Sequence, residues 1–405
     1  MKNIFKYASL LLSAVMLISC HGNSGEEPDG PDGPDGPVTG KVLELTGDKA
    51  YVQTFGGDYV TLTVTLDGQP VTEGVTFYDA KGKVLALDGF KFSTTKEGEY
   101  SIWASYGTFQ TETIVIRAVS VEIPETPADS NPASTSFKTR VFLNEFTTVG
   151  CTACPTMKKV LHEVLEDEAM KEMLVMTECH TGLVNAVPDP AYVRTEFDDF
   201  CATTGYPFVK VDMYYGFDNS AHYTAAPLKN DLEAMHDSKA DVAAGIAVNC
   251  SVKEGKLVAK VTMKSAADGA YRIGAMLLED GIYGKQHGGD AQPWMNTHDG
   301  CVRYIDSYYS ASGAPRYYGH SVGEVAKGKT ADYIFVWDLD KIWEDGTKYG
   351  EMYGNVKWDA RVDENLHMAV FVSTVGLNDK GEEYYYVNNV IDVRNLNGKT
   401  PFEYR

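Results

Sequence analysis

Residues 41–121 alternate polar and apolar side chains in short runs. An alternation with a period of two residues is the pattern of a β-strand with one buried face. The clearest runs are Tyr59–Thr65, Val75–Tyr78 and Thr113–Ile116. Turn signals separate the runs at Asp67–Gly68, Lys81–Gly82 and Glu97–Gly98. This spacing predicts an immunoglobulin-like β-sandwich over residues 41–121.

A tyrosine late in this region supports the sandwich. Tyr100 is placed like the tyrosine corner of immunoglobulin-type domains, and Ile102 stands where antibody domains have their second cysteine. We therefore expect a sandwich without a disulfide, most simply a spacer module. The Pro-, Thr- and Ser-rich stretch 122–136 indicates a linker to the next domain.

Helical and strand patterns alternate between residues 137 and 239. Arg140–Phe146 and Met173–Thr177 are apolar enough for buried strands, and residues 158–166 carry apolar side chains on one helical face. Helices are also expected at 198–204 and 227–238. Alternating strands and helices predict an α/β domain with a central sheet over residues 137–239.

Apolar runs separated by Gly, Asp and Lys turns return after residue 240. They predict a C-terminal β-sandwich over 240–405, with an irregular insert of about fifty residues at 280–330. The whole chain is therefore expected to be an α+β multidomain protein.

The first forty residues predict an export signal and a spacer. Lys2 and Lys6 precede an apolar core, and a lipobox ends at Cys20, so residues 1–20 indicate a lipoprotein signal peptide with Cys20 as the lipidated residue. Residues 21–40 form an acidic Pro/Gly linker, which resembles a surface-export signal or is simply a solvated spacer. We expect an outer membrane lipoprotein that faces the periplasm or the cell surface and contacts the membrane through its lipid anchor only.

The charge of the chain excludes one class of partner. The formal net charge is −21 at pH 7. Because phosphate binding needs a basic patch, nucleic acid is not expected as a partner. We also expect no cofactor, since the chain has no P-loop or Rossmann fingerprint.

A pair of cysteines lies where the strand Arg140–Phe146 gives way to a helix. Cys151 and Cys154 form a Cys-x-x-Cys motif followed by Pro155. The first turn of a helix offers unpaired N–H groups and partial positive charge, which stabilise a thiolate. About fifty residues later Pro207 precedes the apolar strand Phe208–Val211. A reactive dithiol is the leading functional hypothesis.

These motifs resemble the thioredoxin superfamily, and more closely the thioredoxin-like outer membrane lipoproteins of Bacteroidetes (the outer membrane protein 28 family). The resemblance covers residues 137–405. It implies a thioredoxin-like domain that exchanges disulfides with protein thiols or disulfides. Cys151 would be the nucleophile and Cys154 the resolving thiol, while a cis Tyr206–Pro207 bond would place Pro207 beside them.

Two features depart from the thioredoxin pattern. Gly150 stands where many thioredoxins have a tryptophan, and the segment 212–216 is too short to give the usual hairpin strand in full. We therefore expect a trimmed fold.

Other interpretations stay open. The Cys151 and Cys154 pair could be a permanent structural disulfide in a surface binding or adhesion lipoprotein. Cys179 and Cys201 could form a disulfide staple. His180 could join the dithiol in a metal site, although a packed or hydrogen-bonded histidine is the simpler interpretation.

The insert holds His287, His298, Cys301 and His320. These residues lack the short spacings of a zinc motif. A surface loop ordered by aromatic packing is therefore expected there.

Overall fold

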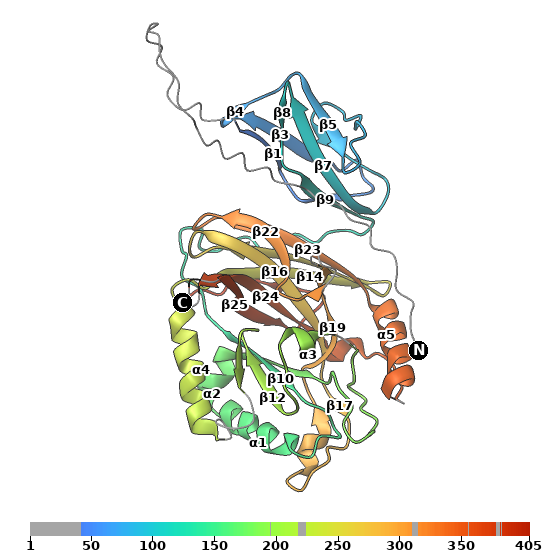
Figure 1. Cartoon of the computed structure of the whole chain (residues 1–405), viewed down its shortest axis with the longest axis vertical. Coiled ribbons are helices and arrows are strands. Elements are labelled where there is room, and N and C mark those ends of the chain that lie inside the picture. Colours follow the sequence, from blue (N-terminus) through green and yellow to red (C-terminus); the bar gives the residue numbers. More distant parts are fainter. Residues whose placement is uncertain are drawn as a thin grey trace, which may run out of the picture. The chain divides into compact units, whose positions relative to one another are not determined.

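The computed structural model describes residues 42–194, 196–217, 224–309, 315–354, 356–377, 381 and 383–405. The predicted signal peptide 1–20, its Cys20 and nearly all of the acidic linker lie outside the described residues. Along the part of the chain that is described, no helix is both long and apolar enough to cross a membrane. The fold is mostly β, with several sheets and few helices (Figure 1).

Residues 43–119 form two sheets around one apolar core. One sheet has the order β1-β3-β4 with β6 beside β3, and the other has the order β2-β9-β7-β5 with β8 beside β7. Alternate side chains of β3 are buried, as the period-two pattern predicts. The Tyr100 hydroxyl donates a hydrogen bond to the Lys96 carbonyl at 2.9 Å. The strands are β1 (Leu43–Gly47), β2 (Tyr51–Gln53), β3 (Val60–Leu66), β4 (Gln69–Pro70), β5 (Val75–Asp79), β6 (Lys91–Phe92), β7 (Gly98–Tyr106), β8 (Phe109–Gln110) and β9 (Ile114–Val119).

A nine-stranded mixed sheet runs through the rest of the chain in the order β13-β12-β10-β11-β19-β16-β24-β25, with β22 beside β16. It crosses the expected boundary at residue 240, because β19 pairs in parallel with β11 through Glu178 and Cys301. The strands are β10 (Val141–Phe146), β11 (Leu174–Cys179), β12 (Phe208–Val211), β13 (Tyr215–Phe217), β16 (Gly269–Glu279), β19 (Cys301–Ile305), β22 (His320–Val325), β24 (Leu366–Leu377) and β25 (Glu383–Val393).

A smaller antiparallel sheet has the order β23-β15-β14-β26, and the main apolar core includes side chains of both sheets. Its strands are β14 (Gly245–Lys253), β15 (Lys256–Lys264), β23 (Thr330–Asp338) and β26 (Lys399–Thr400). All six residues of β10 are buried. Phe142 and Phe146 face the main core, whereas Val141 and Leu143 face the helices.

The helices α1 and α4 share a second core with β10, β11 and β12 (Figure 1). The expected helices are confirmed at α1 and α4, and β13 is as short as the sequence predicts. The helices are α1 (Cys154–Leu165), α2 (Glu168–Met173), α3 (Phe197–Phe200), α4 (Ala225–Lys239) and α5 (Leu339–Tyr349).

The insert at 280–330 is not the irregular surface loop expected. It supplies β19 and β22 to the large sheet, and it forms two small hairpins. These are β17 (Ile282–Tyr283) with β18 (Thr297–His298), and β20 (Tyr308–Tyr309) with β21 (Pro315–Arg316). The prediction failed because the two sheet strands are short and pair with segments remote in sequence, which a local pattern does not reveal.

Candidate functional site

Cys151 and Cys154 are joined by a disulfide at the start of α1. The helix begins at Cys154, and Pro155 occupies its first turn, where a missing N–H costs no hydrogen bond. The Cys154 backbone N–H donates to the Cys151 sulfur at 3.1 Å. A thiolate formed at Cys151 would therefore meet both this N–H group and the positive end of the helix dipole.

Both cysteines are buried in the disulfide form. Cys151 is 4% exposed and Cys154 is 1% exposed, so Cys151 is the more accessible of the two by a small margin. Exchange with a protein substrate needs direct contact between sulfur atoms. Access to the disulfide therefore depends on the segments that cover it.

One covering segment lies within residues 184–189. The Val149 N–H donates to Asp189 at 3.0 Å, and the Asn185 side chain donates to the Gly150 carbonyl at 3.1 Å. A Cβ on Gly150 would lie 2.2 Å from the Val184 carbonyl oxygen. The close approach of this segment explains why a glycine, and no bulky tryptophan, precedes Cys151.

The second covering segment, 284–288, comes from the insert. The Gln286 side chain donates to the Cys151 carbonyl at 3.1 Å, and the His287 N–H donates to the Val149 carbonyl at 2.8 Å. Gly288 packs so tightly on the dithiol loop that a Cβ there would lie 2.5 Å from the Thr152 carbonyl oxygen. The insert thus restricts access to the dithiol.

Pro207 lies immediately before β12, and the Tyr206–Pro207 peptide bond is cis, which confirms that part of the sequence analysis. The Tyr206 hydroxyl lies 3.3 Å from the Thr181 hydroxyl. A Cβ on Gly182 would lie 2.3 Å from the same Tyr206 oxygen, so the residues after β11 contact this turn closely.

Six buried ionisable residues, one of them on α1, lie close together, and we call them the buried ion cluster. Glu145 and Glu178 are register partners on the parallel strands β10 and β11. Lys158 lies on α1 one turn after Cys154, so both side chains are on one face of the helix. The cluster consists of Glu145, Lys158, Glu178, His180, Asp189 and His298.

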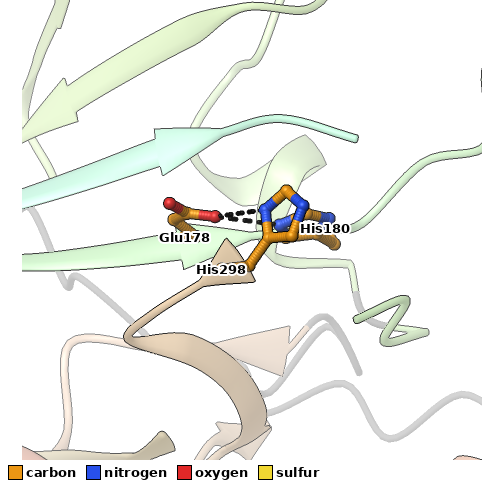
Figure 2. Close-up of side chains that lie close together, drawn as sticks. All are labelled: Glu178, His180 and His298. Atoms are coloured by element: carbon orange, nitrogen blue, oxygen red, sulfur yellow. Dashed lines mark hydrogen bonds and ion pairs between the residues drawn. The ribbon is translucent and has the colours of Figure 1, made fainter. Parts of the chain in front are cut away.

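Glu178 is at the centre of the hydrogen bonding in this cluster (Figure 2). Its Oε2 lies 2.9 Å from His298 Nδ1 and 3.3 Å from His180 Nε2. The Lys158 ammonium lies 2.9 Å from Glu178 Oε1 and 2.9 Å from His298 Nδ1. His180 and His298 meet edge to face, with ring centroids 4.9 Å apart. Glu178 belongs to β11, and His180 directly follows this strand. His298 belongs to β18 of the insert.

Each histidine also has a partner on its far side. His180 Nδ1 lies 2.8 Å from Asp189, and His298 Nε2 lies 3.1 Å from the Gly284 carbonyl. Burial lowers the pKa of His180, but the charge of Asp189 and its hydrogen bond outweigh burial and raise that pKa well above its usual value. Burial alone would raise the pKa of Asp189, but the charge and hydrogen bond of His180, together with the hydrogen bond from the Val149 N–H, lower it to about 2.

The two neighbouring glutamates differ in protonation behaviour. Burial and the adjacent Glu178 charge raise the pKa of Glu145 to about 8. Burial alone would raise the pKa of Glu178 too, but Lys158 and the hydrogen bonds from His180 and His298 hold it well below its usual value. Among the described residues, neither carboxyl oxygen of Glu145 has a hydrogen-bond partner.

The remaining described cysteines, Cys179, Cys201, Cys250 and Cys301, are free and buried. The possible disulfide between Cys179 and Cys201, which the sequence left open, is therefore not formed. Burial raises the pKa of Cys179 to about 12 and that of Cys301 to about 11, which makes both thiols poor nucleophiles at neutral pH.

The candidate histidines separate into different environments. His180 is buried and hydrogen-bonded, as the simpler interpretation held. His298 was expected in a surface loop but lies fully buried beside Glu178. His287 is exposed, and His320 pairs with Asp306 away from the cluster. Glu145, Lys158 and Glu178 were not among the expected site residues. Only Glu178 had a signal in the sequence, because it precedes His180 by two residues and so lies on the same side of an extended chain.

No family model and no curated protein matches this chain. Among solved structures, HBP35 of Porphyromonas gingivalis is similar, with 16% sequence identity and a TM-score of 0.45. The match covers 64% of this chain and 75% of that one. The assignment of a function therefore depends on the site itself.

Proposed function

We propose that this chain exchanges disulfides with protein substrates through Cys151 and Cys154. The observation that carries the proposal is the position of the Cys151–Cys154 disulfide at the first turn of α1, with the Cys154 N–H directed at the Cys151 sulfur. That position stabilises a thiolate on Cys151, which is the attacking and the leaving sulfur in exchange.

In the reductive direction, the reduced protein supplies two electrons. The Cys151 thiolate attacks a substrate disulfide, forms a mixed disulfide and releases one substrate thiolate. The Cys154 thiolate then attacks the Cys151 sulfur, releases the second substrate thiolate and restores the Cys151–Cys154 disulfide. The substrate is reduced to a dithiol and the protein pair is oxidised; the reverse sequence oxidises a substrate dithiol.

The fold context belongs to the same proposal. A buried strand, a Cys-x-x-Cys helix and a strand preceded by Pro207 are arranged as in a thioredoxin-like domain over residues 137–239. The two-sheet domain at 41–121 is then an immunoglobulin-like spacer. The signal peptide and Cys20 make the protein a lipid-anchored envelope protein, and its partners are protein thiols or disulfides.

A second function is favoured by the burial of both sulfurs beneath segment 284–288. In a surface binding or adhesion protein, the disulfide would only hold the start of α1 in place. The two functions differ in whether the Cys151–Cys154 pair alternates between the disulfide and the dithiol form.

The decisive experiment is a protein disulfide reduction assay, with insulin as substrate and a small dithiol as reductant. We expect activity above buffer for the wild type, its loss in Cys151→Ser, and a trapped mixed disulfide in Cys154→Ser. Cys250→Ser is the matched control, because Cys250 is a free buried thiol on β14 and should leave the activity unchanged. A wild type without activity, in which Cys151 stays unreactive toward alkylating agents after reduction, would establish the structural disulfide instead.

A further inference from the structure

We propose that Glu178, His180 and His298 form a binding site for a divalent transition metal of the Zn²⁺ class. One ligand atom from each residue lies within 4.8 Å of the others, and all three residues are buried. Two imidazole nitrogens and one carboxylate are a ligand set that zinc uses in proteins, with a further position left open. Figure 2 shows one nitrogen of each ring turned toward the same oxygen of Glu178.

The outer hydrogen bonds of both rings orient them for this role. A carbonyl oxygen only accepts hydrogen bonds, so His298 Nε2 carries the proton that it donates to Gly284. His180 Nδ1 likewise donates to the Asp189 carboxylate. The inner nitrogens, His298 Nδ1 and His180 Nε2, are the two that lie next to Glu178. A metal ion would displace the proton at each inner nitrogen and bind the lone pair that this leaves. Metal-binding histidines are held in this way by a carboxylate or carbonyl behind the ring.

Lys158 shows that this point already attracts a cation. Its ammonium contacts the Glu178 carboxylate and His298 Nδ1, both at 2.9 Å. A metal ion would compete with the ammonium for these two atoms. The site therefore needs a second place for the Lys158 side chain.

Glu145 provides that place. It is the register partner of Glu178, it interacts electrostatically with Lys158, and both its oxygens are without hydrogen-bond partners among the described residues. The cluster contains three carboxyl groups and, in the part of the chain that is described, one lysine paired with them. A divalent ion on Glu178 together with Lys158 turned toward Glu145 gives three formal positive charges for three carboxylates, with both imidazoles neutral.

The metal would join the insert to the sheet. Glu178 and His180 belong to β11 and the turn after it, whereas His298 belongs to β18. The same insert carries segment 284–288, which covers the dithiol. The proposal does not depend on disulfide exchange, because no ligand is a cysteine.

The test is a titration of the full protein with Co²⁺, followed by displacement with Zn²⁺, after chelator treatment and with the Cys151–Cys154 disulfide kept oxidised. Oxidation prevents the dithiol from binding the ion. We expect one ion per chain and visible absorption bands of a Co²⁺ site with nitrogen and oxygen ligands. His298→Ala and His180→Ala should each weaken binding by about 100-fold or more. His236→Ala, on α4 and outside the cluster, should leave binding unchanged.

A variant with the opposite expected effect keeps the test decisive if a ligand variant fails to fold. Lys158→Met removes the competing ammonium and should tighten Co²⁺ binding on the order of 10-fold. Glu145→Gln removes the alternative partner of Lys158 and should therefore weaken Co²⁺ binding. Absence of saturable binding in both the wild type and folded Lys158→Met would overturn the proposal. Binding that is unchanged in folded His298→Ala would overturn it as well, whether or not the protein exchanges disulfides.

Discussion

Glu145 and Glu178 lie side by side in the parallel ladder of β10 and β11, and Lys158 forms its ion pair with Glu178. Lys158 and the two histidines hold the pKa of Glu178 well below its usual value. Burial and the neighbouring charge raise the pKa of Glu145 to about 8. Two adjacent carboxyl groups on one face of the sheet are therefore ionised in different pH ranges, which is common where acid–base or ligand chemistry occurs.

Glu145→Gln should change how stability depends on pH. The pKa of Glu145 is raised in the folded state, so its favourable contribution is complete below the unfolded pKa near 4.5 and is lost as the pH rises through about 8. The free energy of unfolding of the wild type should therefore fall by a few kcal/mol between about pH 5 and pH 9. The glutamine variant should not show this fall. Urea unfolding at several pH values, with a chelator present, measures the difference. Parallel curves for the two proteins would contradict the raised pKa.

Tyr100→Phe should weaken the N-terminal sandwich without disturbing its packing. The hydroxyl donates to the Lys96 carbonyl at 2.9 Å and lies 3.0 Å from the Thr94 hydroxyl. Losing a net hydrogen bond of this kind costs about 1 kcal/mol. Hydrogen exchange of the β7 and β9 amides should become faster. Tyr59→Phe is the control, since its side chain is exposed; equal effects of the two variants would argue against a tyrosine corner.

Lys239→Met should be strongly destabilising. The Lys239 ammonium contacts both Asp212 oxygens, at 2.8 and 2.7 Å, and both residues are buried. Burial lowers the pKa of Lys239 and raises that of Asp212, which shows the cost of removing this pair from water. Removing one partner of a buried pair costs about 3–5 kcal/mol.

The same helix supplies a control for this pair. Lys229 on α4 contacts Asp167 at 3.1 Å, but this pair is partly exposed. An exposed pair contributes about 0–1 kcal/mol. In chemical unfolding, Lys239→Met should therefore lose clearly more unfolding free energy than Lys229→Met. Similar losses of unfolding free energy in the two variants would mean that the buried Asp212 charge finds another partner when Lys239 is removed.

The sequence predicted the features that depend on local order. The strand β10 and the helix α1 with its cysteine pair follow from short patterns, and the structure has both. The cis bond before Pro207 was implied by the resemblance to thioredoxin-like proteins, and the structure has it too. The acidic residue Glu145 within β10 was part of the same strand pattern, but nothing in the sequence indicates that its carboxyl group is buried beside Glu178.

The features that depend on remote pairing could not be predicted in this way. β19 joins β11 through a single register pair, Glu178 with Cys301, which are 123 positions apart in the numbering. His298 reaches the cluster only because that pairing brings the insert to the sheet. A disulfide between Cys179 and Cys201 was possible from the sequence because both lie in the same expected domain, yet the sequence says nothing about the geometry that would join them.

Gly288→Ala should open the dithiol to reagents. Gly288 has a φ of +130°, and a Cβ there would lie 2.5 Å from the Thr152 carbonyl oxygen and 3.0 Å from the Pro155 ring. The new side chain is strained by its own backbone and collides with the loop that carries Cys151, so segment 284–288 must move away. Strain of this kind costs on the order of 1–3 kcal/mol, and about 1.4 kcal/mol is a tenfold change in an equilibrium.

Reduction of the Cys151–Cys154 disulfide by a small phosphine should therefore be on the order of 10-fold faster in Gly288→Ala than in the wild type. Gly289→Ala is the matched control, because a Cβ on Gly289 meets no atom within 4 Å among the described residues. Rates are read by alkylation of the released thiols, and thermal unfolding of each variant separates local opening from global loss of stability. Equal rates in Gly288→Ala and Gly289→Ala would show that segment 284–288 does not control access to the disulfide.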